Sequence, residues 1–90
     1  MAYEIEVEGE GESFAVTVKE GRRQTHHTVR ASAAEVQRLA PGIAPERVIK
    51  AAFRFLLDRE AKESILARFG LGEISRYFPE FPSTISDYLR

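Results

Sequence analysis

The adjacent histidines His26 and His27 are the side chains of this 90-residue chain best suited to bind a metal or transfer a proton. They lie in a segment that we expect to be a strand, where adjacent residues point to opposite faces of the sheet. The two rings therefore cannot chelate one ion, and zinc needs three or four ligands in a chain without cysteine. We expect no metal and no cofactor. We expect His26 at the surface and His27 at the sheet–helix interface, with a ring nitrogen bonded to a backbone carbonyl or a hydroxyl.

The serines and threonines are not arranged as nucleophiles. Catalysis by a hydroxyl group needs a neighbouring base and an acid that orients the base. Thr25 and Thr28 flank the histidines but alternate with them along the strand, and Ser32 is explained as a helix cap. The sequence has no nucleophile elbow, phosphate loop or dinucleotide fingerprint, and nothing singles out a catalytic pair among its glutamates. It therefore predicts that the protein is not an enzyme, and it implies no small-molecule ligand.

Charge is distributed unevenly along the chain. The net charge is −1, so no global field attracts the protein to nucleic acid or to anionic lipid. Residues 1–20, however, carry six glutamates and one lysine, whereas residues 21–90 carry eight acids and twelve bases. Either the acidic strand face pairs with basic neighbours inside the fold, or one half of the chain docks on an oppositely charged partner.

A basic stripe marks one side of the longest predicted helix. Arg47, Lys50 and Arg54 fall opposite the apolar face of that helix and could contact phosphates. Two of these bases also have an acid four residues away, a spacing that pairs charges along a helix and weakens the stripe. Nucleic-acid binding through this basic helix face, with Arg68 and Arg76 as further contacts, is the alternative function.

The segment from Glu63 to Tyr77 resembles a helix-turn-helix with Gly70 at the turn. The apolar anchor Ile74 follows that glycine too early, and Pro79 ends the second helix too soon for it to lie along a major groove. The match to a DNA-reading motif is therefore weak.

The first thirty residues predict a three-stranded antiparallel meander. Apolar and polar residues alternate over 3–7, 14–18 and about 24–31, and glycine-containing turns separate these runs. The apolar side chains of all three strands then share one face of the sheet.

Two short loops set the expected strand register. A two-residue loop at Glu10-Gly11 would place Val7 opposite Phe14. A second loop at Gly21-Arg22, with glycine first as a type II′ turn requires, would place Val29 opposite the same phenylalanine.

Two helices are expected after the meander. A capping box over residues 32–35 opens a helix that runs to Ala40. Helical spacing of apolar residues then continues over residues 46–58, preceded by Pro45 at a position that suits proline.

The last third of the chain predicts two shorter helical pieces. One carries Ile65, Leu66 and Phe69 and ends at Gly70 as a C-cap. The other is a last turn or two over residues 73–78, stopped by a proline.

An α+β fold follows from these elements. We expect an N-terminal three-stranded antiparallel β-meander, then three to four helices packed on one face, with the helix around Phe53 covering the sheet. The single domain is expected over residues 1–80, and an irregular tail over residues 81–90.

Phe55 departs from the periodic apolar face of its helix. A phenylalanine in that position marks either a second packed layer or a docking patch, which includes a homodimer contact.

An uncharacterised family of short bacterial proteins of about this length resembles the chain in its C-terminal third. The run from Phe55 to Phe69 carries the shared residues Phe-Leu-Leu, Arg-Glu, Lys-Glu-Ser-Ile-Leu and Arg-Phe, and Arg-Tyr-Phe-Pro-Glu follows from Arg76, with a weaker echo at His27-Thr-Val29. Family members carry proline at the position of Ala61, which implies that a helix starts there. The resemblance implies a bacterial cytosolic origin and no active site.

A soluble cytoplasmic protein is expected. The absence of cysteine favours a reducing compartment, the first residues lack a signal-peptide pattern, and no apolar run approaches the ~20 residues that span a bilayer. The function we expect is that of a small non-catalytic interaction or regulatory protein whose partner is a protein or a second copy. Its expected contacts are Phe55, Arg47, Lys50, Arg54 and Arg76, with His27 as a polar interface site.

Overall fold

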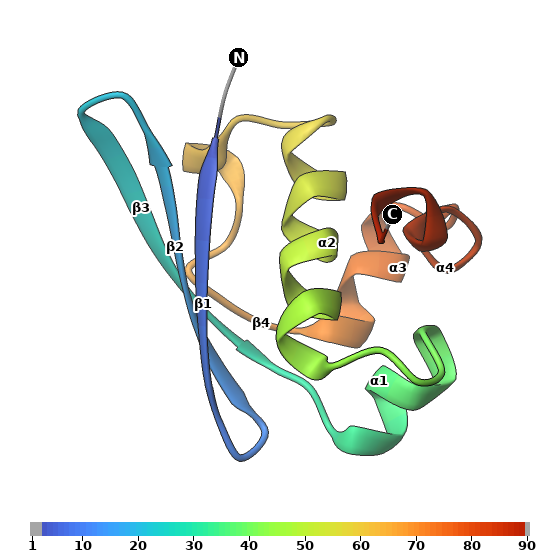
Figure 1. Ribbon diagram of the computed structural model, residues 1–90. Helices are drawn as coiled ribbons and strands as arrows, with labels where there is room; N and C mark the ends of the chain where they lie inside the picture. Colours follow the sequence, from blue (N-terminus) through green and yellow to red (C-terminus); the bar gives the residue numbers. More distant parts are fainter. Residues whose placement is uncertain (1–2, 90) are drawn as a thin grey trace.

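The computed structural model describes residues 3–89, in which a four-stranded sheet carries helices on one face and leaves the other uncovered (Figure 1). Strands β1 (Glu4–Glu10), β2 (Ser13–Glu20) and β3 (Arg23–Arg30) form the expected antiparallel meander. A short strand β4 (Arg68–Gly70) adds to β3 in parallel. The expected α+β architecture is confirmed, and β4 is an addition to it.

The first hairpin has a register that differs from the expected one by two residues. Val7 lies opposite Val16, and Gly9 lies opposite Phe14, because the loop is Gly11-Glu12. Gly11 has a φ of +64°. A tight loop of this kind needs its positive φ at the first position, where glycine is favoured and glutamate is not. A shift of two residues leaves the same side chains on the core face, so the core is unchanged.

The second hairpin has the expected register. Gly21 has a φ of +62° and opens the two-residue loop Gly21-Arg22. Phe14 lies opposite Val29, and Val16 lies opposite His27. The inward-facing residues of β2 and β3 are buried, which forms the sheet side of the core.

The first two helices begin where the sequence predicts. The N-terminus of α1 (Ala33–Leu39) is closed by a capping box, in which Glu35 N–H donates to Ser32 Oγ and Ser32 N–H donates to the Glu35 carboxylate. Helix α2 (Pro45–Leu57) has its proline in the first turn, and Phe53 on its inner side is fully buried. Within residues 3–89, no helix combines the length and the apolar character needed to cross a membrane.

The helix expected around residues 65–70 is wrong. A 3-10 turn, η1 (Lys62–Ser64), is followed by extended chain, and Phe69 lies in β4 opposite Val29. Thr28 N–H donates to the Ala67 carbonyl at 2.7 Å, so this segment hydrogen-bonds along the otherwise open edge of β3. Gly70 has an extended conformation and does not act as a helix C-cap.

The C-terminal segment is helical, and the expectation of an irregular tail over residues 81–90 is wrong for its described part. After η2 (Leu71–Glu73) and α3 (Ile74–Tyr77), which match the expected last turns, the chain forms α4 (Phe81–Thr84) and η3 (Ile85–Tyr88). Phe81 and Ile85 are almost fully buried against α2 and its neighbours. Residue 90 lies outside the described residues.

Candidate functional site

His27 lies at the interface between the sheet and α2, as the sequence predicts. Its Nδ1 is 2.8 Å from the Leu66 carbonyl oxygen, and its Nε2 is 2.8 Å from the Thr25 hydroxyl. Because a carbonyl only accepts, Nδ1 donates the first bond, and Nε2 shares the second with the hydroxyl group. The ring also packs 5.2 Å from that of Phe53. His27 thus ties β3 to the chain before β4, while His26 is exposed on the other face.

Phe55 is fully buried, so the expected partner contact at this residue is wrong. Its ring lies 4.9 Å from that of Phe81, and the rings of Phe78 and Tyr88 are also within 6 Å of it. The Arg59 guanidinium covers the same ring at 3.6 Å from its centre. The C-terminal segment is the second packed layer that this off-face phenylalanine indicated.

Polar contacts hold that layer on α2. Arg59 donates to the Glu80 carboxylate at 3.1 Å, and the Tyr88 hydroxyl donates to Asp58 at 2.6 Å. Hydrogen bonding to Tyr88 and then to Glu80 raises the pKa of Arg59. The pKa of Glu80 is lowered by its own backbone N–H and by Arg59. Each of these charged groups therefore has a partner within the fold, and no sequence pattern indicated these pairings.

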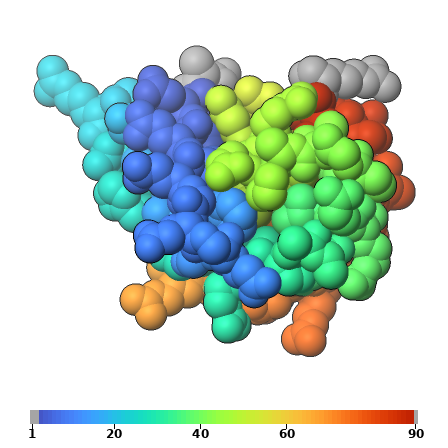
Figure 2. Space-filling view, turned by 60° about the horizontal axis from the view of Figure 1, so that its bottom comes forward, coloured from blue at the N-terminus to red at the C-terminus, as the bar shows by residue number. Residues whose placement is uncertain are grey.

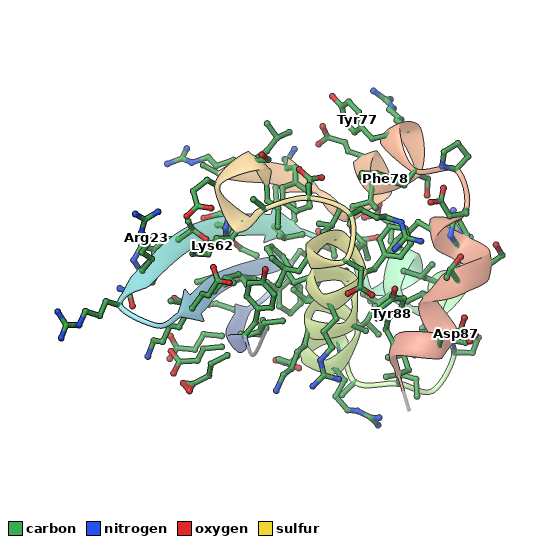
Figure 3. The ribbon with its side chains drawn as sticks, turned by 90° about the horizontal axis from the view of Figure 1, so that it is seen from above. Arg23, Lys62, Tyr77, Phe78, Asp87 and Tyr88 are labelled. Carbon is green, nitrogen blue, oxygen red and sulfur yellow. The ribbon has the colours of Figure 1, made fainter. Side chains whose placement is uncertain are left out.

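Lys62 is a buried cation that the sequence did not reveal. Its ammonium group is 2.9 Å from the Glu20 carboxylate and 2.8 Å from that of Glu63, and its side chain is only 2% exposed. It lies between η1 and the sheet, near Arg23 (Figure 3). The hydrogen bonds that Lys62 donates to Glu63 and then to Glu20 raise the pKa of Lys62, and the bond that Glu63 accepts from Lys62 lowers the pKa of Glu63. This cluster joins the turn after α2 to the end of β2.

An apolar groove opens between the end of α2, the turn after it, β4 and α3, and we call it the Leu66–Tyr77 groove. Its volume is about 240 Å³. Leu66, 52% exposed, and Tyr77, 69% exposed, are the large hydrophobic side chains that residues 3–89 leave exposed, and both line the groove. Tyr77 points away from the molecule while Phe78 points inward (Figure 3). The apolar lining is completed by Leu56, Ile65, Phe69, Ile74 and Phe78, and the polar lining is Glu60, Ser64 and Glu73.

The sequence missed this groove because it placed Leu66 on the buried side of a helix. In the extended chain that the structure has instead, Ile65 is buried and Leu66 is exposed. The sequence carries no strand signal here, because Ile65, Leu66 and Ala67 are consecutive apolar residues and do not alternate with polar ones.

The basic residues that the sequence grouped together do not form one surface. Arg47, Lys50 and Arg54 are exposed on α2, whereas Arg68 alternates with buried Phe69 and so lies on the uncovered face of the sheet. The expected acid partners do not pair with Lys50 or Arg54 within residues 3–89, and Arg47 instead donates to the Leu89 carbonyl at 3.0 Å. The three α2 bases therefore have no carboxylate partner among residues 3–89, but they form only a short stripe.

The acidic strand face is only partly neutralised inside the fold. Lys19 lies 3.1 Å from Glu6 and 4.0 Å from Glu4. Glu8 and Glu10 form no ion pair with any described residue. The strand that carries these acids, β1, lies beside α2 on one face of the molecule (Figure 2). The β1 glutamates, however, alternate with buried Ile5 and so point to the uncovered face of the sheet, away from α2.

Among the described residues, no group of three or more His, Cys, Asp or Glu side chains could hold a metal ion. Comparison of the chain with protein-family models, with curated proteins and with solved structures finds no match. The Leu66–Tyr77 groove is the surface feature with the clearest capacity to bind.

Proposed function

We propose that this protein is a small non-catalytic interaction module that binds a partner protein through the Leu66–Tyr77 groove. One observation carries the proposal: the two large hydrophobic side chains left exposed in the described chain flank the same apolar hollow. Exposed apolar surface of this kind, rimmed by polar residues, is typical of interaction sites.

The size and lining of the groove favour a protein anchor over a small-molecule substrate. Its volume of about 240 Å³ is below the several hundred Å³ that small-molecule sites enclose. A bulky apolar side chain of a partner suits such a hollow, since interface energy is concentrated in side chains that fill pockets. The groups whose pKa values are shifted, Arg59, Lys62, Glu63 and Glu80, do not line the groove and instead hold the fold together.

The charge on the rim indicates what accompanies that anchor. Glu60 has no ion-pair partner within residues 3–89, and Glu73 lines the groove from the other side. We therefore expect a partner segment in which a lysine or arginine follows the apolar anchor. A second copy of the chain fits less well, because a symmetric dimer would bring the same glutamates of both copies together.

The test compares two groove variants with a matched surface variant. Leu66→Ser and Tyr77→Ser remove the exposed apolar groups, and Arg54→Ser removes an exposed α2 side chain outside the groove. A partner isolated by affinity capture is purified, and its binding to each variant is measured by calorimetry. Each groove variant should weaken binding at least about tenfold, while Arg54→Ser should not. Light scattering of the protein alone should show a monomer.

Two results would overturn the proposal. One is a purified partner that binds the groove variants as tightly as the unmodified protein. The other is a stable dimer that Leu66→Ser dissociates, which would make the groove a contact between copies.

The alternative is nucleic-acid binding through the α2 stripe. Its supporting observation is that Lys50 and Arg54 have no carboxylate partner within residues 3–89. The shortness of the stripe opposes it, because so few bases contact few phosphates. If this function operates, affinity for DNA or RNA falls steeply with salt, and the double change Lys50→Gln and Arg54→Gln reduces the slope by about two.

A further inference from the structure

A second hollow lies on the uncovered face of the sheet, where β3 and β4 run side by side. It has a volume of about 440 Å³ and is lined by Ser13, Thr28, Arg30, Arg68, Phe69 and Glu73. The strand register places Arg68 next to Thr28, and Arg30 next to Ser13 on the other neighbouring strand. Two arginines and two hydroxyl groups from three strands therefore surround one point of the sheet surface.

The two arginines are not neutralised by the fold. Neither Arg30 nor Arg68 has a carboxylate within 4.0 Å among the described residues. Glu73 also lines the hollow, but one of its carboxylate oxygens accepts the Gly70 N–H at 2.6 Å. Arg30 and Arg68 lie diagonally across β3 and β4, since the register pairs Arg68 with Thr28 and Arg30 with Gly70, and an anion between them would compensate both charges.

We propose that this hollow binds a single phosphate monoester group. Guanidinium groups present several N–H donors in a plane and bind phosphate oxygens in pairs. Arg30 and Arg68 would each donate to the phosphate from one side, and the hydroxyls of Ser13 and Thr28 would donate to its remaining oxygens. Hydroxyl groups alone do not discriminate anions, so the two arginines carry the affinity.

The rest of the same face selects a compact anion over a polyanion. The outward-facing glutamates of β1 lie two strands away from β3, a separation of about 10 Å. That distance exceeds the Debye length of about 8 Å in physiological salt, so their repulsion of an anion at the site is largely screened. A nucleic-acid backbone laid across the sheet would meet these acids, whereas one phosphate at the β3–β4 edge would not.

The hollow adjoins the Leu66–Tyr77 groove, because Phe69 and Glu73 line both. Resting on the proposed function, one source of the phosphate is a phosphorylated side chain of the partner segment in that groove. A free phosphorylated metabolite is the other source. Both present the same monoester chemistry to the two arginines.

Nuclear magnetic resonance titration of the full chain tests the site. The probes are inorganic phosphate, N-acetyl-O-phosphoserine amide and, at equal ionic strength, sodium acetate. Phosphate and the phosphoserine amide should shift the amides of Ser13, Thr28, Arg30 and Arg68 to saturation. Arg30→Gln and Arg68→Gln should each weaken the binding by about tenfold, whereas the exposed control Arg22→Gln should leave it unchanged. Tighter binding of the phosphoserine amide than of inorganic phosphate supports a side-chain source, and the reverse supports a free metabolite.

The proposal is overturned if phosphate gives no saturable shift, if acetate binds equally well, or if a single-stranded oligonucleotide binds there more tightly than the phosphoserine amide. Leu66→Ser separates this site from the groove, since it should leave the phosphate titration unchanged. If phosphate binds as expected and Leu66→Ser does not weaken partner binding, only the proposed role of the groove is rejected. Loss of partner binding in Leu66→Ser with no phosphate shift rejects only the phosphate site.

Discussion

The Lys62 ammonium lies 2.9 Å from the Glu20 carboxylate, so an ion pair joins the turn after α2 to the end of β2. The same ammonium contacts Glu63 of its own turn at 2.8 Å. Since the lysine side chain is 2% exposed, both acids approach a charge that water barely reaches. Removing the lysine would leave those carboxylates without their partner.

The pH dependence of stability should report this cluster. Glu63 has its pKa lowered from 4.5, so its contribution is present above that value and is lost as pH falls through the folded pKa. Lys62 has its pKa raised from 10.5, so its contribution is present below that value and is lost as pH rises through the folded pKa. Lys62→Met should therefore be less stable than the unmodified protein between these pH values.

Urea unfolding at a series of pH values measures the effect. The stability difference between the two proteins should narrow in strong acid and in strong base. Lys50→Met, which changes an exposed lysine without a carboxylate partner in residues 3–89, is the control. A difference that stays constant across the pH range would show that Lys62 acts through packing alone.

His27→Ala should destabilise the protein by about 2 kcal/mol or more, because two hydrogen bonds and a buried ring are lost together. Thr25→Val removes only the hydroxyl partner of Nε2 and should cost about 1 kcal/mol. His26→Ala changes the exposed neighbour and should cost less than either. Thermal and urea unfolding give all three values, and equal losses at the two histidines would contradict the assigned contacts.

Phe81→Ala should be among the most disruptive single changes, at about 3–5 kcal/mol, because the ring packs directly against Phe55 in the core. That is a large fraction of the stability of a domain this small. Ser86→Ala, at an exposed position three residues before the end of the described segment, is the matched control. Removal of residues 81–90 should unfold the protein, and a truncated protein with a native circular-dichroism spectrum would contradict the packing described.

Gly9→Ala should destabilise by about 1–3 kcal/mol through overpacking. A methyl group at Gly9 would lie 2.7 Å from the Phe14 ring and 2.8 Å from the Glu46 carboxylate. Gly70→Ala is the control, since its new methyl group would make only an ordinary contact 3.4 Å from Glu73. Equal stability of the two variants, measured by urea unfolding, would argue against the observed register of the first hairpin.

That register could have been predicted from the chain. The second hairpin was predicted correctly because its glycine stands first in the loop, and the same rule applied to Gly11 selects the loop Gly11-Glu12. Gly9 then lies opposite Phe14, where the absence of a side chain makes room for the ring. The rule that places glycine first in such a loop is therefore sufficient to predict this register, and the expected register is wrong because it placed Gly11 second.

Residues 62–70 could not be assigned locally. Ile65, Leu66 and Phe69 have a spacing that suits a helix, and no alternation of apolar and polar residues favours a strand. What decides the outcome is the backbone of β3, whose open edge bonds this segment from about forty residues away in sequence. A non-local partner of this kind leaves no mark on the segment itself.

The candidate sites also divide into those that local sequence patterns predict and those that depend on a distant strand. His27 was placed correctly because the strand pattern fixed its face, whereas the break in the helix pattern at Phe55 did not decide between a second packed layer and a docking patch, and the partner contact expected there is wrong. The Leu66–Tyr77 groove and the Arg30–Arg68 hollow both depend on β4, so neither was visible before that strand was known.

The packing of Phe81 and Ile85 over Phe55 also bears on how the molecule is made. A nascent chain presents the meander and α2 well before Ile85 has left the ribosome, and until then the Phe55 ring lacks the cover that Phe81 and Tyr88 give it. During synthesis this aromatic surface is open to chaperones and to other nascent chains. Proteostasis of the protein should therefore depend on how quickly its final helical turns are translated.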